Sequence, residues 1–331
     1  MPSQSRGQRE QSRTRAVKLD ARQREIRLST PYRLDLTVSV LRRLSTNLVD
    51  VIAPTGEYYR VLDGLARGDT TPVVAHVRQS RADRLVVRLE GGDHGRAETD
   101  RAIALLRRSL GVDRELAHFD RAAAAIPWLA PLALRMRGVK PPRYQSLWEA
   151  CVNSIVFQQV SLLAASAIMG RLITAVTEPL ESAGVRLHPF PTIHQFLATS
   201  HDALRAAGLS ESKLGTLGRV AEAIAEGALD ERALEELPSD AAADRLREIK
   251  GIGPWTAALV LLRGLGRLDV FPANDTSVAR NLAMVSGSAE PDVDAALKAL
   301  EPQQGMLYYH LLLGRLESRG ALGEPSGASV V

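Results

Sequence analysis

The stretch LREIKGIGPWTAALVLLRG runs from Leu246 to Gly264 and contains a sharp break in its pattern. Two glycines, Gly251 and Gly253, interrupt a pattern that is otherwise typical of helix on both sides. Glycine inside a helix costs roughly 1 kcal/mol relative to alanine, so the break indicates a turn. Proline favours the first turn of a helix, because its missing N–H would have no partner there. The stretch therefore predicts a helix that ends at Lys250, a tight hairpin, and a second helix that begins at Pro254.

The hairpin has two interpretations. Its backbone N–H groups and those of the following helix N-terminus point outward and form a site for an anion such as a phosphate, to which Lys250 adds a charge-assisted contact. The alternative is a plain connector between two helices, since many such turns contain glycine. The tripeptide alone favours neither interpretation.

Composition narrows the class of protein. The chain has 331 residues, of which 45% are hydrophobic and 24% are charged, so it is long enough for two or three globular domains. It has no run of about 18 apolar residues and no apolar signal segment, so we expect a cytoplasmic protein, associated with the nucleoid if the host is a bacterium. A single cysteine, Cys151, and seven scattered histidines predict no disulfide and no metal site.

Charge is concentrated at the N-terminus. Residues 1–30 contain eight Lys and Arg against three Asp and Glu, which gives +5, and the whole chain has a net charge of +4, so the remainder sums to −1. We predict a disordered basic tail over 1–30. Such a tail favours a polyanionic partner or serves as a solubilising arm.

Periodicity predicts two structural regions. Apolar residues alternate in RLDLTVSV (33–40), PVVAHV (72–77) and RLVVRL (84–89), which is typical of antiparallel strands, and a helical pattern follows at 99–111. We therefore expect an α+β domain over 31–112.

The pattern beyond this domain is helical. It includes helices at 146–157 and 162–176, the second with Ser161 as its N-cap. The predicted fold is mainly α with an N-terminal α+β domain. The remaining predicted segments are a helical region at 113–320 that contains the helix–hairpin–helix at 244–265, and a flexible tail at 321–331.

The hairpin sequence L-x-x-I-K-G-I-G-x-W-T-A resembles the signature of the helix–hairpin–helix (HhH-GPD) DNA glycosylase superfamily. In DVFPANDTSVARNL, Asp275 lies where the family has its catalytic carboxylate, counted from Trp255. SLWEACVNSIVFQQVS resembles the family helix that ends in I-x-x-Q-Q-x-S. The resemblance covers roughly residues 31–315 and is greatest to 3-methyladenine DNA glycosylase II, the AlkA type.

This resemblance implies hydrolysis of the N-glycosidic bond between a damaged base and deoxyribose. A carboxylate near C1′, assigned to Asp275, stabilises the positive charge that develops on the sugar. An alkylated purine such as 3-methyladenine is already cationic and leaves readily, so one carboxylate suffices where ordinary glycosides need two. The structural alternative for Asp275 is a helix N-cap.

The residue after the hairpin predicts the type of reaction. Family members with lyase activity have a nucleophilic lysine there, whereas this chain has Trp255. Without that amine no Schiff base forms, so we expect a monofunctional enzyme without lyase activity. Trp255 either stacks on the extruded base or belongs to the core.

The resemblance also implies a set of binding residues. Gln158 and Gln159 would enter the minor groove with Gln159 as the wedge, although an exposed polar turn is the alternative. We expect damaged double-stranded DNA as the partner, a monomeric protein, and no cofactor, although family hairpins can hold a monovalent cation. The predicted DNA-binding residues are Lys250, Gly251, Ile252, Gly253, Gln158, Gln159 and Ser161, and the predicted base pocket contains Trp255, Phe157 and Tyr308.

One segment departs from the family pattern. The C-terminal helix of the family usually has a Trp and an Arg after a proline, and here Gln303 and Gln304 follow Pro302. One aromatic wall of the pocket is therefore missing. Tyr308 or Tyr309 is the candidate to replace it, and the alternative is that both tyrosines belong to the core. Two other functions stay open: a glycosylase for a different lesion such as a deaminated base, and a DNA-binding relative without catalysis.

Overall fold

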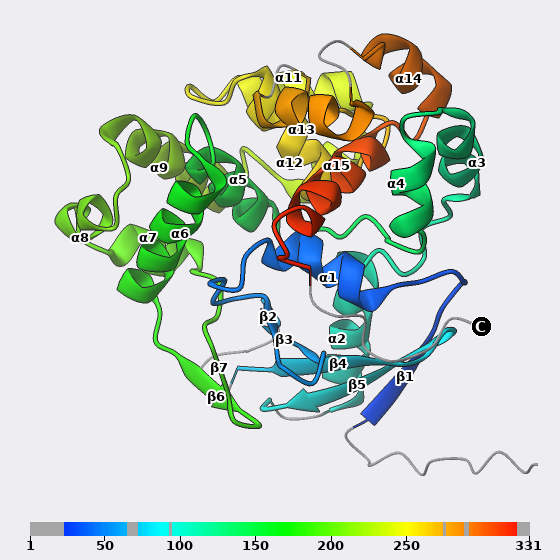
Figure 1. Ribbon diagram of the computed structural model, residues 1–331. Coiled ribbons are helices and arrows are strands. Elements are labelled where there is room, and N and C mark those ends of the chain that lie inside the picture. Colours follow the sequence, from blue (N-terminus) through cyan, green and yellow to red (C-terminus); the bar gives the residue numbers. More distant parts are fainter. Residues whose placement is uncertain (1–22, 65–71, 93–94, 274–275, 288–290, 323–331) are drawn as a thin grey trace, which may run out of the picture.

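The computed structural model describes residues 23–64, 72–92, 95–273, 276–287 and 291–322 (Figure 1). A five-stranded antiparallel sheet lies at one end of the molecule, and helices cover it and build the rest. The predicted fold class, mainly α with an N-terminal antiparallel sheet, is confirmed. In sheet order the strands are β1 (Gln23–Arg27), β5 (Arg84–Glu90), β4 (Val74–Arg81), β3 (Tyr58–Val61) and β2 (Val51–Ile52).

The two strands predicted at 72–77 and 84–89 form the centre of this sheet as β4 and β5. Their alternating residues, among them Ala75, Val77, Leu85 and Val87, are fully buried. They face the core because successive strand residues point to opposite faces of a sheet.

The strand predicted at 33–40 is wrong, because this segment forms helix α1 (Leu34–Arg42). Leu34 and Val38 belong to the apolar core that also contains the buried residues of the sheet. Leu36 and Val40, on the opposite face of the helix, belong to a second core among the C-terminal helices. A helix buried on two faces has apolar residues at every second position, which imitates the period of a strand.

The predicted disorder over 1–30 is wrong for the described part of that segment. Strand β1 pairs with β5 in antiparallel register, with Ile26 opposite Leu85. Ile26 is buried, and Glu25 forms an ion pair with Arg84. These contacts hold the segment on the sheet edge. Residues 1–22 lie outside the described residues.

The helices predicted at 99–111, 146–157 and 162–176 are confirmed as α2 (Arg96–Ser109), α5 (Leu147–Val156) and α6 (Leu162–Val176). A short hairpin of β6 (Leu180–Ser182) and β7 (Val185–Leu187) interrupts the region expected to be helical. The other helices are α3 (Ala117–Ala125), α4 (Ala130–Arg135), α7 (Ile193–Ala198), α8 (His201–Ala206), α9 (Glu211–Ala225), α10 (Glu231–Glu236), α11 (Ser239–Arg247), α12 (Pro254–Arg263), α13 (Thr276–Ser286), α14 (Val293–Leu300) and α15 (Gly305–Glu317).

Helix α12 lies between two apolar clusters. Ala257 and Val260 belong to the cluster that also contains residues of α5, α6, α9 and the sheet, whereas Leu262 belongs to the cluster that contains residues of α3, α4 and α15. Figure 1 shows these two groups of helices on either side of the centre of the molecule. The position of α12 in both clusters fixes the hairpin that precedes it.

A buried ion-pair cluster joins the sheet to α5. Arg60 on β3 is 1% exposed and donates to Asp50 at 2.7 Å and to Glu149 at 2.6 Å. Burial raises the pKa of the Glu149 carboxyl, which lies in the first turn of α5. Because buried charges need close partners, Arg60 orients α5 with respect to the sheet.

Candidate nucleic-acid interface

Helices α11 and α12 pack against each other and are joined by the predicted hairpin. Ile252 at the turn is buried, and its N–H donates to the carbonyl of Ile249 at 3.0 Å. Gly253 is the N-cap of α12, and Pro254 is its first residue. The two apolar isoleucines anchor the turn in the core, and this leaves Lys250 and Gly251 exposed.

The two glycines of the hairpin are present for different reasons. Gly251 has φ +104, and a Cβ atom at this position would lie 2.0 Å from the hydroxyl of Thr216 on α9. Gly253 has an ordinary φ of −90, and a Cβ there would meet no described atom within 4 Å. The fold therefore requires glycine at 251. At 253 the absent side chain leaves space next to the backbone.

One side chain from α9 and one from the loop between α5 and α6 bind two carbonyls of the hairpin. Arg219 on α9 donates to the carbonyl oxygen of Lys250 from Nε at 3.0 Å and from Nη2 at 2.7 Å. The amide of Gln158 donates to the carbonyl of Gly251 at 3.2 Å. These two carbonyls already accept hydrogen bonds from the protein, and we assign no role to a cation there.

The α5–α6 loop lies against the hairpin, so the structure brings together two segments that are about 90 residues apart in the chain. The Gln158 amide also donates to the hydroxyl of Thr256 at 2.7 Å. In the structure the amide nitrogen of Gln158 connects the loop to the hairpin and to α12, and its contact with DNA stays a prediction. Ser161 caps α6 as expected, since its hydroxyl accepts from the N–H of Ala164.

Gln159 lies at the tip of this loop. Its side chain is exposed, and its backbone has φ +55, which is uncommon for a residue other than glycine. Val160 and Leu163 next to it are also exposed, the latter at 63%. The loop and the first turn of α6 therefore present one amide and two apolar side chains to the outside of the protein.

The predicted base-pocket residues are partly buried. The guanidinium of Arg43 lies over the ring of Phe157, 4.1 Å from its centroid. Tyr308 on α15 contacts the ring of Tyr309 edge-on, and Trp255 lies in the first turn of α12. Arg43 was not among the residues predicted from the sequence. Its guanidinium is buried, and burial lowers its pKa.

The two glutamines that replace the family's Trp and Arg bind backbone groups. Gln303 accepts from the N–H of Phe119 at 2.9 Å and donates to the carbonyl of Glu115 at 2.7 Å. Gln304 donates to the carbonyl of Asp269 at 2.6 Å. These side chains fasten the start of α15 to α3 and to the segment before Asp275. Asp275 itself lies outside the described residues.

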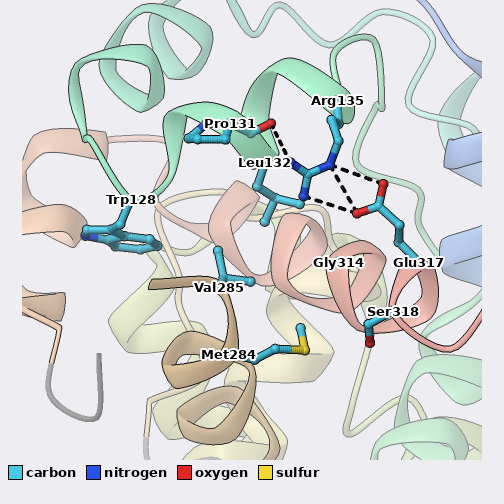
Figure 2. A pocket seen from close by; sticks show the side chains of 9 residues that line it. All are labelled: Trp128, Pro131, Leu132, Arg135, Met284, Val285, Gly314, Glu317 and Ser318. Atoms are coloured by element: carbon cyan, nitrogen blue, oxygen red, sulfur yellow. Dashed lines mark hydrogen bonds and ion pairs between the residues drawn. The ribbon is translucent and has the colours of Figure 1, made fainter. Parts of the chain in front are cut away.

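A pocket of about 270 Å³ lies elsewhere, among α4, α13 and α15 (Figure 2). Trp128 and Met284 line its apolar part, and Arg135 pairs with Glu317 at its rim. None of the predicted site residues that the structure describes lines this pocket.

The described ranges contain neither a candidate metal cluster nor a candidate membrane-spanning helix. No group of three or more His, Cys, Asp or Glu side chains in them is placed to hold a metal ion. None of the helices in the described part of the chain has the length and apolar character needed to cross a membrane.

The chain is similar to known DNA repair proteins in sequence and in structure. Residues 152–303 match the family described as HhH-GPD superfamily base excision DNA repair protein. The chain is 31% identical over 181 residues to the "probable bifunctional transcriptional activator/DNA repair enzyme AlkA" of Mycobacterium tuberculosis. This match covers 53% of the chain and 34% of that relative, so the chain spans about a third of the relative's length.

Solved structures share the fold. The 3-methyladenine DNA-glycosylase from Archaeoglobus fulgidus superimposes with a TM-score of 0.70 at 25% identity, over 89% of this chain and 99% of that one. The Clostridium acetobutylicum 8-oxoguanine glycosylase/lyase, in complex with double-stranded DNA, superimposes with a TM-score of 0.66 at 13% identity, over 88% and 93%.

The hairpin, the adjoining loop and the helices around them have the fold of the helix–hairpin–helix DNA glycosylases. Residues 152–303, slightly less than half of the chain, are similar in sequence to the HhH-GPD superfamily.

Proposed function

We propose that the chain is a monofunctional DNA glycosylase that removes alkylated purines of the 3-methyladenine type and leaves an abasic site. The observation that carries this proposal is that Gln158 hydrogen-bonds the α5–α6 loop to the hairpin and to the first turn of α12. The tip of the loop therefore lies beside the turn to which we assign phosphate binding. A protein that binds one strand and extrudes a base from it needs two such elements side by side.

The hairpin supplies the strand contact. The backbone N–H groups at the α12 N-terminus favour a phosphate, and Lys250 adds a positive charge. The lack of a side chain at Gly253 allows the phosphodiester to approach the backbone closely. Non-bridging phosphate oxygens accept these hydrogen bonds without reading the base sequence.

The α5–α6 loop fills the space that the extruded nucleotide leaves. Gln159 is the wedge, and its exposed side chain and left-handed backbone project it from the tip. The extruded base then stacks on aromatic faces, for which Trp255, Phe157 and Tyr308 are the candidates.

Asp275 performs the chemistry in this proposal. Its carboxylate stabilises the cationic sugar as the C1′–N bond breaks, and it orients the water that adds to C1′. The base leaves with the bonding electron pair, and an alkylated purine neutralises its own positive charge in doing so. One proton of the water is released.

No lyase step is proposed. Trp255 follows the hairpin, so that position has no amine to form a Schiff base with the sugar. Because the fold is shared with a glycosylase/lyase, it does not decide this point. Treatment with borohydride in the presence of abasic DNA should therefore trap no covalent complex, whereas a trapped complex would contradict the assignment.

One observation favours a second lesion class. Gln303 and Gln304 bind backbone groups and provide no aromatic wall, which weakens stacking on a cationic base. A neutral deaminated base such as hypoxanthine depends less on such stacking. This candidate is the second proposed substrate.

The experiment is an excision assay on duplexes with a single 3-methyladenine, 7-methylguanine or hypoxanthine. We expect monomeric protein to release free base and to leave alkali-labile sites in the alkylated duplexes. Release of hypoxanthine alone would favour the second candidate. Salt-dependent DNA binding without release of any base would indicate a non-catalytic DNA-binding protein.

A further inference from the structure

One face of α9 contacts both of the loops proposed to meet DNA. Lys213, Thr216 and Arg219 are three residues apart, so they lie in a row along one side of the helix. We call these three residues the α9 brace. Its two cations are the kind of side chain usually assigned to DNA phosphates.

Lys213 holds the α5–α6 loop. Its ammonium group donates to the carbonyl of Val156 at 2.7 Å and to the carbonyl of Gln158 at 3.0 Å. Val156 is the last residue of α5, so the ammonium lies at the negative end of the helix dipole and binds carbonyls that lack partners within the helix. The side chain is half-buried, and burial lowers the pKa of the Lys213 ammonium.

Arg219 and Thr216 hold the hairpin. Arg219 donates through two nitrogens to the Lys250 carbonyl, and its Nη2 also donates to the Thr216 hydroxyl at 3.2 Å. The Thr216 side chain in turn lies directly under Gly251, where it leaves no room for a Cβ atom. The guanidinium orientation is thus set by atoms of the protein.

We propose that Lys213 and Arg219 are positioning residues. They set the distance between the α5–α6 loop and the hairpin, so that the hairpin binds the DNA strand at the place where the loop displaces the base. This inference rests on the proposed function. The alternative is that both cations bind DNA phosphates directly, as Lys250 is proposed to do.

Salt dependence separates these roles. Each cation that neutralises a phosphate adds about 0.9 to the slope of log Kd against log salt concentration. A cation that binds only protein carbonyls adds nothing to that slope. A misplacement of about 1 Å at the loop costs up to about 100-fold in rate, because the reacting groups lose alignment.

The test uses the full chain with Lys213→Met and Arg219→Met, and with Lys250→Gln as the matched phosphate-contact variant. Binding is measured on an abasic duplex between 50 and 200 mM KCl, which is roughly the range in which phosphate contacts lose their affinity. Single-turnover excision is measured on the best lesion duplex. Thermal melts show whether each variant is folded.

We expect Lys213→Met and Arg219→Met to keep the wild-type salt slope and to lose about 10- to 100-fold in excision rate. Lys250→Gln should reduce the slope by about 0.9. Lys213→Arg, which keeps charge and donors, should recover most of the lost rate, and it replaces Lys213→Met if that variant does not fold.

Two results would overturn the proposal. One is a salt slope that falls by about 0.9 in either methionine variant, as a phosphate contact requires. The other is a wild-type excision rate in both of them. If the wild-type protein binds DNA and excises nothing, the proposed function fails by itself, and the slopes still decide between carbonyl and phosphate contacts.

Discussion

The side-chain amide of Gln158 donates a 2.7 Å hydrogen bond to the hydroxyl of Thr256, and this bond joins the α5–α6 loop to the first turn of α12. The same amide donates to the carbonyl of Gly251 in the hairpin. One side chain thereby connects two segments that are distant in sequence and are proposed to hold the same DNA strand.

Gln158→Ala removes both hydrogen bonds and should reduce excision about 10-fold, because the loop and hairpin lose their common register. The cost in the free energy of unfolding should be about 1–2 kcal/mol, as for two partly exposed hydrogen bonds. Single-turnover kinetics and urea unfolding measure the two effects. Gln159→Ala is the matched variant, since its exposed side chain should affect base extrusion with little change in stability. Equal kinetics for wild type and Gln158→Ala would contradict the coupling.

The hairpin glycines give a second prediction, because Gly251 and Gly253 differ in surroundings. Gly251→Ala places a Cβ 2.0 Å from Thr216 at a positive φ and should destabilise the protein by about 3 kcal/mol. Gly253→Ala meets no described atom and loses only the preference of an N-cap for glycine over alanine, so it should cost about 1 kcal/mol or less. Its affinity for an abasic duplex should fall about 10-fold if the phosphodiester approaches there. Thermal unfolding and fluorescence anisotropy test the pair, and unchanged DNA affinity in Gly253→Ala would count against a close approach of the strand.

Arg60→Met should destabilise the fold strongly, because it leaves Asp50 and Glu149 buried without their cation. Loss of one partner in a buried charge cluster costs about 3–5 kcal/mol. Arg232→Met is the control: its ion pair with Glu236 is exposed, and its loss should cost less than about 1 kcal/mol. Urea unfolding of both variants measures the difference. Similar midpoints would mean that the cluster does not hold the sheet to α5.

His310 on α15 predicts a specific pH dependence of stability. Its ring is buried against Phe119, with Nδ1 2.9 Å from the carbonyl oxygen of Met306, and burial lowers its pKa from 6.5 to about 4. Between these values the unfolded chain binds the proton and the folded chain does not, so stability falls as pH decreases. The loss between pH 7 and pH 5 should be about 2 kcal/mol from this group alone.

Urea unfolding at the two pH values, for the wild type and for His310→Gln, isolates the contribution of this imidazole. The difference in unfolding free energy between the two proteins should shrink by about 2 kcal/mol at pH 5, because acid destabilises only the wild type through this group. A difference that stays constant with pH would show that His310 is accessible to protons in the folded state.

The sequence predicts the hairpin well because its signals are local. Gly251, Gly253 and Pro254 specify a turn and a helix start through backbone preferences that hold in any surroundings. The N-cap role of Ser161 is equally local, and it is confirmed. The segment at 33–40 is different, because its two buried faces depend on partners that come much later in the chain.

The polar contacts of the site could not be derived from sequence. Nothing local in the sequence around Gln158 shows that its amide binds Thr256, since that contact depends on how α5 packs against α12. The spacing of Lys213, Thr216 and Arg219 does predict that they lie on one face of a helix. Only the fold shows that the face binds carbonyls of two loops.

In the proposed reaction the carboxylate of Asp275 stabilises the cationic sugar as the glycosidic bond breaks, and Asp275→Asn removes this carboxylate. Asparagine keeps the capacity to cap a helix and removes the negative charge. We expect wild-type thermal stability and unchanged binding to an abasic duplex, together with base release that falls about 1000-fold in single-turnover assays on alkylated duplexes. Base release at the wild-type rate by a folded Asp275→Asn protein would show that this carboxylate is not the catalytic group.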